Sequence, residues 1–286
     1  MSRARTRRLA VVGAPIEHSL SPVLQGAAAR ALGLDWRYER RLVGAGELAD
    51  FIDVLDGAWL GLSVTAPLKE EARALSASVD ERAARTGAVN TLLLGRGVRG
   101  FNTDVGGIVR AFTDAGVASV GSGAIVGAGA TALSALLALA ELGATHVTVA
   151  LRTAARGARL EQLATGLGIP LTLQALDAPM PEVDVAVSTL PASAPIVPVF
   201  VSPPTRLLDA DYARADGSRF AATLPPTCLI DGREMLLGQA VLQARIFALG
   251  DAATPLADEP GVVAAMRAAM RTAAGVEAAS ARLEQS

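Results

Sequence analysis

The chain has 286 residues, of which 51% are hydrophobic and only 3% are aromatic, and its net charge at pH 7 is -2. This length suffices for two modest domains or one large one, and a core of Ala, Val and Leu suits helices packed on a parallel sheet. The small net charge gives no reason to expect nucleic acid, and no apolar stretch of about 18 residues predicts a membrane span. The single cysteine, Cys228, rules out an internal disulfide, and two histidines far apart argue against zinc. We therefore expect a soluble, cytoplasmic protein without a metal, a nucleic-acid partner or a membrane partner.

The N-terminal region is expected to alternate short strands and helices, at 9–12, 23–32, 36–41 and 47–55. Ser21 before Pro22 is typical of a helix start, because Ser caps a helix and Pro fits its first turn. Ser19 and Ser21 can both point their hydroxyls at one anion, and the free N–H groups of the helix start add to that attraction. The alternative is that Ser21 only caps the helix and Ser19 is solvated.

A buried strand at 58–64 runs into a turn at Pro67 and then into a helix that begins at Lys69. Lys69 is the only lysine in the chain, and all other strong bases are arginines. Arginine keeps its proton at any useful pH, whereas the pKa of a lysine falls readily on burial. Lys69 is therefore our first candidate for a group that transfers a proton or polarises a carbonyl. The alternative is a residue on the surface of a helix.

The only two asparagines, Asn90 and Asn102, lie at strand ends next to threonines, with a Gly/Arg hairpin at 95–100 between them. Asn is common in turns, so the placement of both near Lys69 and Asp104 carries more information than either alone. Asp104 opens a helix, where capping is its alternative role, and its functional role would be to pair with Lys69. Polar residues thus gather at the C-terminal ends of strands, where open sheets of the predicted α/β class bind ligands.

A second α/β unit begins at Gly121. A strand at 124–126 leads into Gly127-Ala-Gly129-Ala-Thr-Ala132, a helix that ends at Leu142 and a strand at 146–151. This order of strand, G-x-G-x-x-A turn, helix and strand is the context that a dinucleotide fingerprint requires. Contacts to the cofactor are expected from Gly127, Ala128, Gly129 and Ala130.

The residues after this second strand are Arg152-Thr-Ala-Ala-Arg156, and no acid follows before Glu161. NAD-binding folds usually place an acid here for the ribose 2′-hydroxyl, whereas NADP-binding folds place Arg. The pattern therefore favours NADP, with the guanidinium groups of Arg152 and Arg156 on the 2′-phosphate. The alternative is a pair of arginines that face solvent at a helix start.

The remaining expected elements are strands at 183–188, within 206–212 and at 228–232, and helices at 235–247 and 260–274. The first of these strands ends in Ser188-Thr189, which could line the nicotinamide side of a cofactor. Gln239 would face the cleft if its helix returns to the first domain.

Six motifs in order resemble the shikimate dehydrogenase family over nearly the whole chain. They are Gly13 to Pro22, Gly61 to Lys69, Gly87 to Thr91, Asn102 to Asp104, Gly127 to Gly129 with Arg152-Thr153, and Gly232 to Gln239. Each motif alone is weak, but six in order are specific. The resemblance implies a substrate domain of residues 1–107 and 236–286, and a Rossmann-type NADP-binding domain of residues 108–235.

The resemblance also implies reversible reduction of 3-dehydroshikimate to shikimate by NADPH, a step in chorismate and aromatic amino acid biosynthesis. Lys69 would polarise the carbonyl and pass the proton, paired with Asp104, which agrees with the need for a cation near the developing oxyanion. The carboxylate would be bound by Ser19 and Ser21. The ring hydroxyls and the carbonyl would be held by Thr65, Asn90, Asp104 and Gln239. Besides the glycine turn, the cofactor would be contacted by Arg152, Thr153, Arg156, Thr189, Gly232 and Met235.

Three positions depart from the family pattern. Ser63 stands where many members have Asn, and Leu151 stands where Asn often precedes Arg-Thr. The stretch after Tyr212 reads Ala-Arg-Ala-Asp-Gly-Ser instead of Asn-Pro and Thr-Pro-Leu. Because that loop lies near the nicotinamide and the substrate in the family, quinate or an amino analogue as substrate, and NAD as cofactor, stay open.

Two other classes stay open as alternatives. One is a non-catalytic relative that senses a ligand of the shikimate pathway, against which the intact Lys69 and Asp104 argue. The other is a different Rossmann enzyme with a catalytic lysine, such as a methylenetetrahydrofolate dehydrogenase, against which the paired serines argue because they suit a small carboxylate. The sequence leaves the oligomeric state open, with a homodimer as one alternative.

Overall fold

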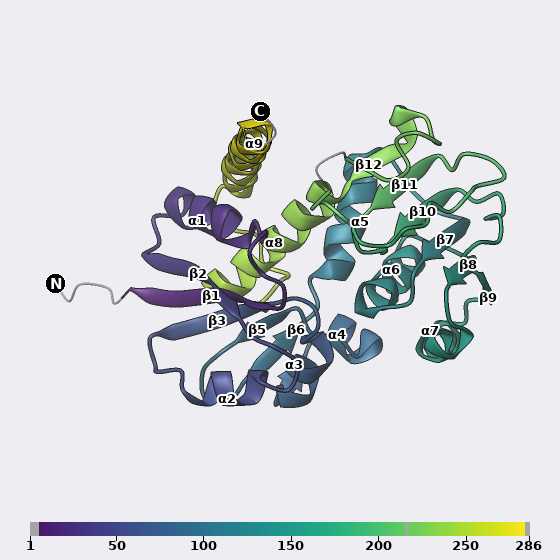
Figure 1. Cartoon of the computed structure of the whole chain (residues 1–286). Coiled ribbons are helices and arrows are strands. Elements are labelled where there is room, and N and C mark those ends of the chain that lie inside the picture. The colour runs from purple at the N-terminus through teal and green to yellow at the C-terminus, as the bar shows by residue number, and fades with distance from the viewer. Residues whose placement is uncertain (1–5, 215–216, 284–286) are drawn as a thin grey trace. The chain divides into compact units, whose positions relative to one another are not determined.

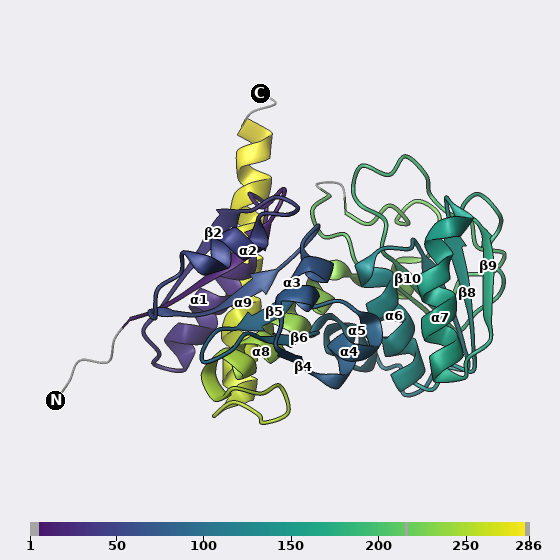
Figure 2. The ribbon, with the colours of Figure 1, turned by 90° about the horizontal axis from the view of Figure 1, so that it is seen from below.

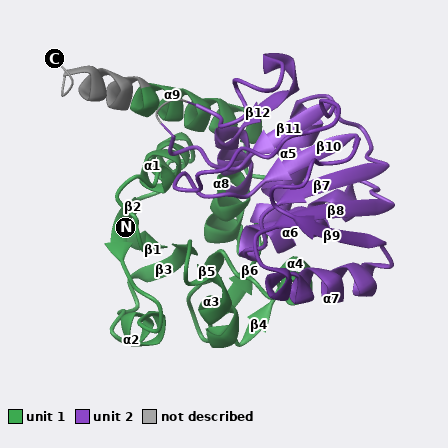
Figure 3. Ribbon diagram, turned by 45° about the vertical axis from the view of Figure 1, so that its right-hand side comes forward, with its two compact units in different colours: residues 1–103, 240–286 green, residues 104–239 purple. Residues whose placement is uncertain are grey.

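The computed structural model describes residues 6–214 and 217–283, with the backbone alone for 275–283. Residues 215–216, in the altered stretch after Tyr212, lie outside the described residues. The chain divides into two compact units, unit 1 with residues 1–103 and 240–286 and unit 2 with residues 104–239 (Figure 3). The boundaries expected from the sequence, after 107 and before 236, each lie four residues from these. The second boundary falls inside helix α8 (Gly232–Leu249).

Unit 1 is built around a six-stranded mixed sheet in the order β2-β1-β3-β5-β6-β4 (Figure 1). Its elements are β1 (Arg7–Gly13), α1 (Ser21–Ala31), β2 (Trp36–Leu42), α2 (Leu48–Asp53), β3 (Trp59–Val64), α3 (Lys69–Leu75), β4 (Ser78–Val79), α4 (Glu81–Thr86), β5 (Thr91–Leu93), β6 (Arg99–Phe101), the second half of α8, and α9 (Glu259–Leu283). Strand β1 pairs in parallel with β2 and β3, whereas β5 and β6 form the antiparallel hairpin that the sequence predicts.

The central strands of unit 1 are buried on both faces. On one face, Leu62 and Leu92 pack with Leu68 and Ala72 at the start of α3. On the other face, Leu9 and Phe101 pack with Ile246 and Phe247 of α8. Strands covered on both faces read as nearly continuous apolar runs, which is why the strands at 9–12 and 58–64 are visible in the sequence.

Unit 2 is built around a six-stranded sheet in the order β12-β11-β10-β7-β8-β9, and all its strand pairs are parallel. This is the strand order of doubly wound dinucleotide-binding folds, and its topological switch point lies between β7 and β10. Its elements are α5 (Asp104–Asp114), β7 (Ser122–Val126), α6 (Ala130–Glu141), β8 (His146–Leu151), η1 (Ala154–Gly157), α7 (Ala158–Leu167), β9 (Leu171–Ala175), β10 (Val185–Ser188), β11 (Arg206–Asp209), η2 (Pro226–Cys228), β12 (Leu229–Asp231) and the first half of α8.

The two faces of this sheet are covered differently. Residues of α5, α6 and α7 form one core with the sheet, including Phe112, Leu136 and Leu160, and Figure 2 shows α6 and α7 side by side along it. The other face is covered by irregular segments, from which Met180 and Phe220 pack on the strands. The predicted α/β class is therefore confirmed in both units.

Six short or weakly patterned elements were not predicted from the sequence, namely β4, α4, α7, β9 and the short helices η1 and η2. Helix α4 has only six residues, too few to show a helical period, although both its ends carry recognisable caps. The Asp80 Oδ1 atom accepts the N–H of Ala83 at 2.8 Å, and Gly87 ends the helix in the left-handed conformation with φ of 65°.

Candidate active site

The loop between β1 and α1 carries both predicted serines. The Oγ atom of Ser19 accepts the backbone N–H of Ser21 at 3.3 Å, and helix α1 begins at Ser21 with Leu20 at the N-cap position. The prediction that Ser21 caps this helix is therefore wrong, and Ser19 satisfies one of the free N–H groups instead. The guanidinium of Arg40 donates to the Ser19 carbonyl at 2.7 and 3.0 Å and holds the loop against β2.

A buried hydrogen-bond chain runs from this loop into the centre of unit 1. The Tyr38 hydroxyl donates to Ser63 Oγ at 2.6 Å, and Ser63 donates to Gln243 Oε1 at 2.8 Å. The amide nitrogen of Gln243 donates to the Asn90 carbonyl at 3.2 Å and to Thr91 Oγ1 at 3.0 Å. Burial raises the pKa of Tyr38 above its ordinary value, against the effect of hydrogen bonds with Ser63 and Ser21. Tyr38 therefore keeps its proton at neutral pH, so its hydroxyl remains the donor in the hydrogen bond to Ser63.

Backbone hydrogen bonds bring the predicted residues Thr65, Lys69 and Asn90 together at the end of β3. The N–H of Leu68 donates to the Thr65 carbonyl at 3.0 Å, and the N–H of Val89 donates to the Lys69 carbonyl at 2.9 Å. The N–H of Val64 donates to the Asn90 carbonyl at 2.7 Å. Helix α3 begins at Lys69, as predicted. Lys69 is half-buried, and Asn90 is buried.

The two asparagines play different local roles. Asn90 and Thr103 bond side chain to side chain at 2.9 Å, and the Thr103 N–H donates to Asn90 Oδ1 at 2.9 Å. The side chain of Asn102 donates to Thr86 Oγ1 at 2.9 Å and so ties β6 to the end of α4. Both asparagines are thus bonded within unit 1, and Asn90 follows Val89, whose N–H donates to the Lys69 carbonyl. The residue after Thr103 is Asp104, which opens α5 as predicted and is 5% exposed.

In unit 2, helices α5 and α8 approach each other at Gly107. A Cβ atom at this position would lie 2.8 Å from the Met235 carbonyl oxygen and 2.9 Å from the backbone nitrogen of Gln239. Gly107 lies one helical turn after Asp104 in α5. The two predicted substrate residues of unit 2, Asp104 of α5 and Gln239 of α8, therefore lie within about one turn of the point where these helices approach each other. The side-chain nitrogen of Gln239 donates to the Leu236 carbonyl at 2.8 Å.

The glycine turn lies at the switch point of the parallel sheet, between the ends of β7 and β10. Gly127 has φ of 111°, and a Cβ on it would collide with the hydroxyl oxygen of Thr189 after β10. Gly129 is the N-cap of α6 and has open space where a Cβ would stand. No acid occupies the first turn of α6. An uncapped helix N-terminus without an acid and with open space before it fits the pyrophosphate of a dinucleotide.

The residues that favour NADP lie together at the C-terminal end of β8. Arg152 and Thr153 follow the strand directly, and Arg156 lies in η1. The N–H of Arg156 donates to the Thr153 carbonyl at 2.9 Å, which folds the segment back on itself. Both guanidinium groups come from exposed residues. The donor set therefore fits a 2′-phosphate.

A cavity of about 290 Å³ lies in unit 2 at the C-terminal ends of β11 and β12. Among its lining residues are Asp209, Asp211, Tyr212 and Gly232. Of these, only Gly232 was predicted as a site residue, and the predicted Met235 is buried one turn further along α8. Tyr212 is the last residue of the range 206–212 in which a short strand is predicted, and this position near a strand end is the signal that could have identified Tyr212 as a cavity residue. The Oδ1 atom of Asp209 is buried and makes no hydrogen bond to the described residues.

The sheet order, the glycine turn at the switch point and the polar strand ends of a separate unit define a two-domain, dinucleotide-dependent oxidoreductase. Family models agree: the shikimate dehydrogenase substrate binding domain matches residues 11–92, and shikimate / quinate 5-dehydrogenase matches residues 115–200. The shikimate dehydrogenase (NADP(+)) of Methylobacterium radiotolerans is 37% identical over 256 residues, which cover 82% of this chain and 89% of that protein. The chain belongs to the shikimate dehydrogenase family.

Curated and solved relatives extend this similarity over more than nine-tenths of the chain. The shikimate dehydrogenase (NADP(+)) of Halobacterium salinarum is 38% identical over 91% of this chain and 97% of that protein. The crystal structure of Mycobacterium tuberculosis shikimate dehydrogenase matches with a TM-score of 0.73 at 33% identity, over 92% of this chain and 99% of that chain. The Thermus thermophilus enzyme, solved in complex with NADP(H) and shikimate, matches with a TM-score of 0.72 at 29% identity, over the same shares. Within residues 6–214 and 217–283, no helix is long and apolar enough to cross a membrane.

Proposed function

We propose that this protein catalyses the reversible, NADP-dependent reduction of 3-dehydroshikimate to shikimate, in chorismate and aromatic amino acid biosynthesis. The observation that carries the proposal is the cluster of Thr65, Lys69 and Asn90 at the end of β3, where backbone hydrogen bonds join the segment 64–69 to the segment 89–90. Relatives named shikimate dehydrogenase (NADP(+)) and a structural neighbour solved with NADP(H) and shikimate support it.

In this proposal the site residues predicted from the sequence bind the substrate and move the proton. The hydroxyls of Ser19 and Ser21 bind the substrate carboxylate, and Thr65, Asn90 and Gln239 hold the ring hydroxyls. NADPH, when bound, supplies the hydride that reduces the ketone. The ammonium of Lys69 stabilises the charge that develops on the carbonyl oxygen and donates the proton to it, and in the reverse direction its amine accepts that proton. Asp104 keeps Lys69 in place by pairing with it.

The cofactor is held by unit 2. The backbone N–H groups from Gly127 to Ala130, at the start of α6, bind the pyrophosphate. Arg152, Thr153 and Arg156 bind the adenosine side with its 2′-phosphate. The nicotinamide side is contacted by Thr189, Gly232 and Met235. A cytoplasmic location and a homodimer stay predictions.

The test is an absorbance assay at 340 nm with shikimate or quinate, each with NADP or NAD. We expect turnover with shikimate and NADP, with a kcat in the ordinary enzyme range of about 1–10³ per second. Faster turnover of quinate, or a preference for NAD, would contradict the proposed substrate or cofactor and favour the alternative that the altered stretch after Tyr212 suggests. No turnover with any pair would contradict the proposed activity and favour the ligand-sensor alternative.

A further inference from the structure

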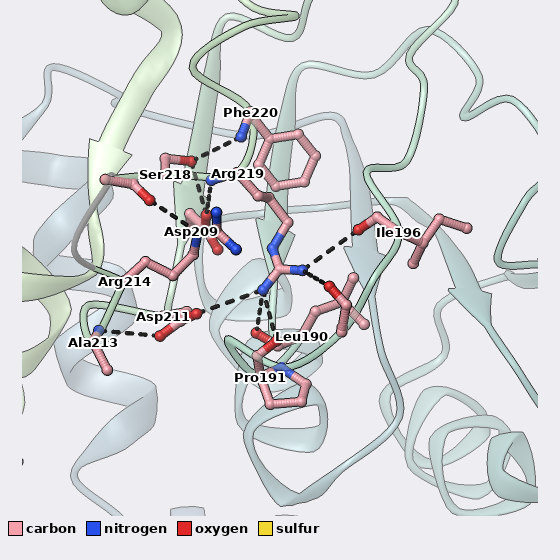
Figure 4. Close-up of polar contacts among 12 residues, drawn as sticks. Leu190, Pro191, Ile196, Asp209, Asp211, Ala213, Arg214, Ser218, Arg219 and Phe220 are labelled. Atoms are coloured by element: carbon pink, nitrogen blue, oxygen red, sulfur yellow. Dashed lines mark hydrogen bonds and ion pairs between the residues drawn. The ribbon is translucent and has the colours of Figure 1, made fainter.

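Arg219 directly follows the stretch 213–218 that departs from the family pattern, and it lies outside both stretches that the family models match. Its side chain is 1% exposed. The guanidinium donates to four backbone carbonyls of one loop, as Figure 4 shows. The acceptors and their distances are Leu190 at 3.1 Å, Pro191 at 2.7 Å, Ala194 at 3.2 Å and Ile196 at 3.4 Å. A carboxylate oxygen of Asp211 lies 3.5 Å from one terminal nitrogen, whereas the buried Nε atom makes no hydrogen bond to the described residues.

The backbone of Arg219 is fixed to the end of β11. The Asp209 Oδ2 atom accepts the Ser218 hydroxyl at 2.7 Å and the N–H of Arg219 at 3.2 Å. The next residue, Phe220, is fully buried on the sheet face that irregular segments cover, with its ring 6.1 Å from that of Phe200. The guanidinium therefore extends from an anchored point and does not follow the loop that it binds.

The loop that Arg219 binds has little structure of its own. Between residues 190 and 198 the described backbone forms one hydrogen bond within the loop, from the Ala194 N–H to the Pro191 carbonyl. The planar guanidinium can reach four carbonyls because its donors point in several fixed directions, which a lysine ammonium cannot reproduce. Arg219 thus sets the path of this loop.

The loop begins beside the glycine turn. It follows Thr189, whose hydroxyl donates to the Val126 carbonyl at 3.0 Å and lies against Gly127. On its other side the guanidinium contacts Asp211, which lines the cavity together with Tyr212. Arg219 therefore connects the segments that follow β10 and β11, at the edge of the sheet where ligands bind in such folds.

We propose that Arg219 is a positioning residue for the nicotinamide half of the cofactor, an inference that rests on the proposed function. It acts through the loop after Thr189 and through Asp211, and it touches neither cofactor nor substrate. In the proposed function the adenosine half is held at the end of β8, which is two strands from β10 in the sheet order. Arg219 should therefore affect the binding of the whole dinucleotide and leave the binding of its adenosine half unchanged.

The test compares two probes, NADPH and 2′,5′-ADP, by titration of the full-length wild-type protein and Arg219→Lys. We expect the Kd of NADPH to rise by roughly ten-fold in the variant, because charged hydrogen bonds to the loop are lost. The Kd of 2′,5′-ADP should change by less than about two-fold, as for distant and independent sites. If shikimate is turned over, kcat should fall by roughly 10²-fold, which a 1 Å misplacement can cause.

The matched control is Arg206→Lys, because the guanidinium of Arg206 also binds backbone carbonyls, those of Thr205 and Ala115, but at the opposite end of β11. It should leave both Kd values unchanged. If Arg219→Lys does not fold, the second variant is Asp211→Asn, which removes only the charge opposite the guanidinium. This variant should raise the Kd of NADPH and leave the Kd of 2′,5′-ADP unchanged.

An equal rise in the Kd values of NADPH and 2′,5′-ADP, or no rise in either, would overturn the proposal for Arg219. Failure of the proposed function gives a different result, because the wild-type protein would then turn over no shikimate. The two titrations would still decide the role of Arg219.

Discussion

Thr189 lies directly against Gly127, although the two residues come from different strands of the parallel sheet. The Thr189 hydroxyl donates to the carbonyl of Val126, 63 positions earlier in the chain, at 3.0 Å. This bond places its oxygen where a Cβ of residue 127 would stand. The contact explains why the first glycine of the turn cannot carry a side chain, since it combines a positive φ with a close neighbour.

The first prediction separates the two glycines of the turn. Gly127→Ala should lower the free energy of unfolding by about 1–3 kcal/mol, the usual cost of a strained backbone position. Gly129→Ala should leave the free energy of unfolding nearly unchanged, because its Cβ would meet no atom within 4 Å. It should nevertheless raise the Kd of NADPH by at least roughly ten-fold, because the backbone must approach the pyrophosphate closely there. Thermal denaturation and fluorescence titration measure the two effects, and normal NADPH binding by Gly129→Ala would contradict the pyrophosphate assignment.

The second prediction concerns cofactor choice. Arg152→Gln should raise the KM for NADP by roughly 10- to 10²-fold, the effect of losing a charged hydrogen bond, and should leave the KM for NAD unchanged. Arg159→Gln, an exposed arginine of α7, is the matched control and should change neither value. Equal effects on NADP and NAD would show that Arg152 does not bind the 2′-phosphate.

The third prediction concerns stability and pH. The Asp184 Oδ2 atom accepts the N–H groups of Ser122 at 2.9 Å and Gly121 at 2.8 Å, and these bonds hold the pKa of its carboxyl below the ordinary value. Because the folded pKa is lowered, the stabilisation is present above the unfolded pKa of about 4 and is lost as pH falls through the folded pKa. Asp184→Asn should cost less than about 1 kcal/mol at pH 7, since the group is exposed.

The same variant should lose less free energy of unfolding than the wild type as the pH falls from about 5 to about 2. In this range the wild-type Asp184 becomes protonated and loses the stabilisation that its lowered pKa reflects. Urea denaturation at several pH values measures this difference. Asp177→Asn is the control, because the carboxylate of this exposed residue accepts no hydrogen bond from the described residues. An identical pH dependence of the wild type and Asp184→Asn would count against the role of the two N–H groups.

The elements with strong local signals were predictable from the sequence. The strand, glycine turn and helix from 122 to 141 follow one another directly, so local order alone indicated a dinucleotide-binding unit. The start of α3 at Lys69 also followed from the preceding buried strand and Pro67. These signals are local, because each depends on residues within one or two turns.

Contacts between distant segments were not predictable. Gln243 joins Ser63 to Asn90 across more than 150 positions, yet in the sequence it is one polar residue on an apolar helix. Arg219 was missed because four of its five partners are backbone carbonyls, which every residue type carries. The sequence showed that the stretch after Tyr212 departs from the family pattern, but it did not show that the neighbouring Arg219 binds the loop after Thr189.

The most direct test of the account is the kcat of Lys69→Ala with shikimate and NADP. We predict a fall of at least about 10²-fold, the usual effect of losing a general acid or base, with the Kd of NADPH unchanged and the fold intact. Lys69→Arg should be similarly impaired, because arginine keeps the charge but cannot release the proton, while Arg73→Ala, later on the same helix, should be active. A near-normal kcat for Lys69→Ala would contradict the assignment of Lys69 as the proton-transferring group.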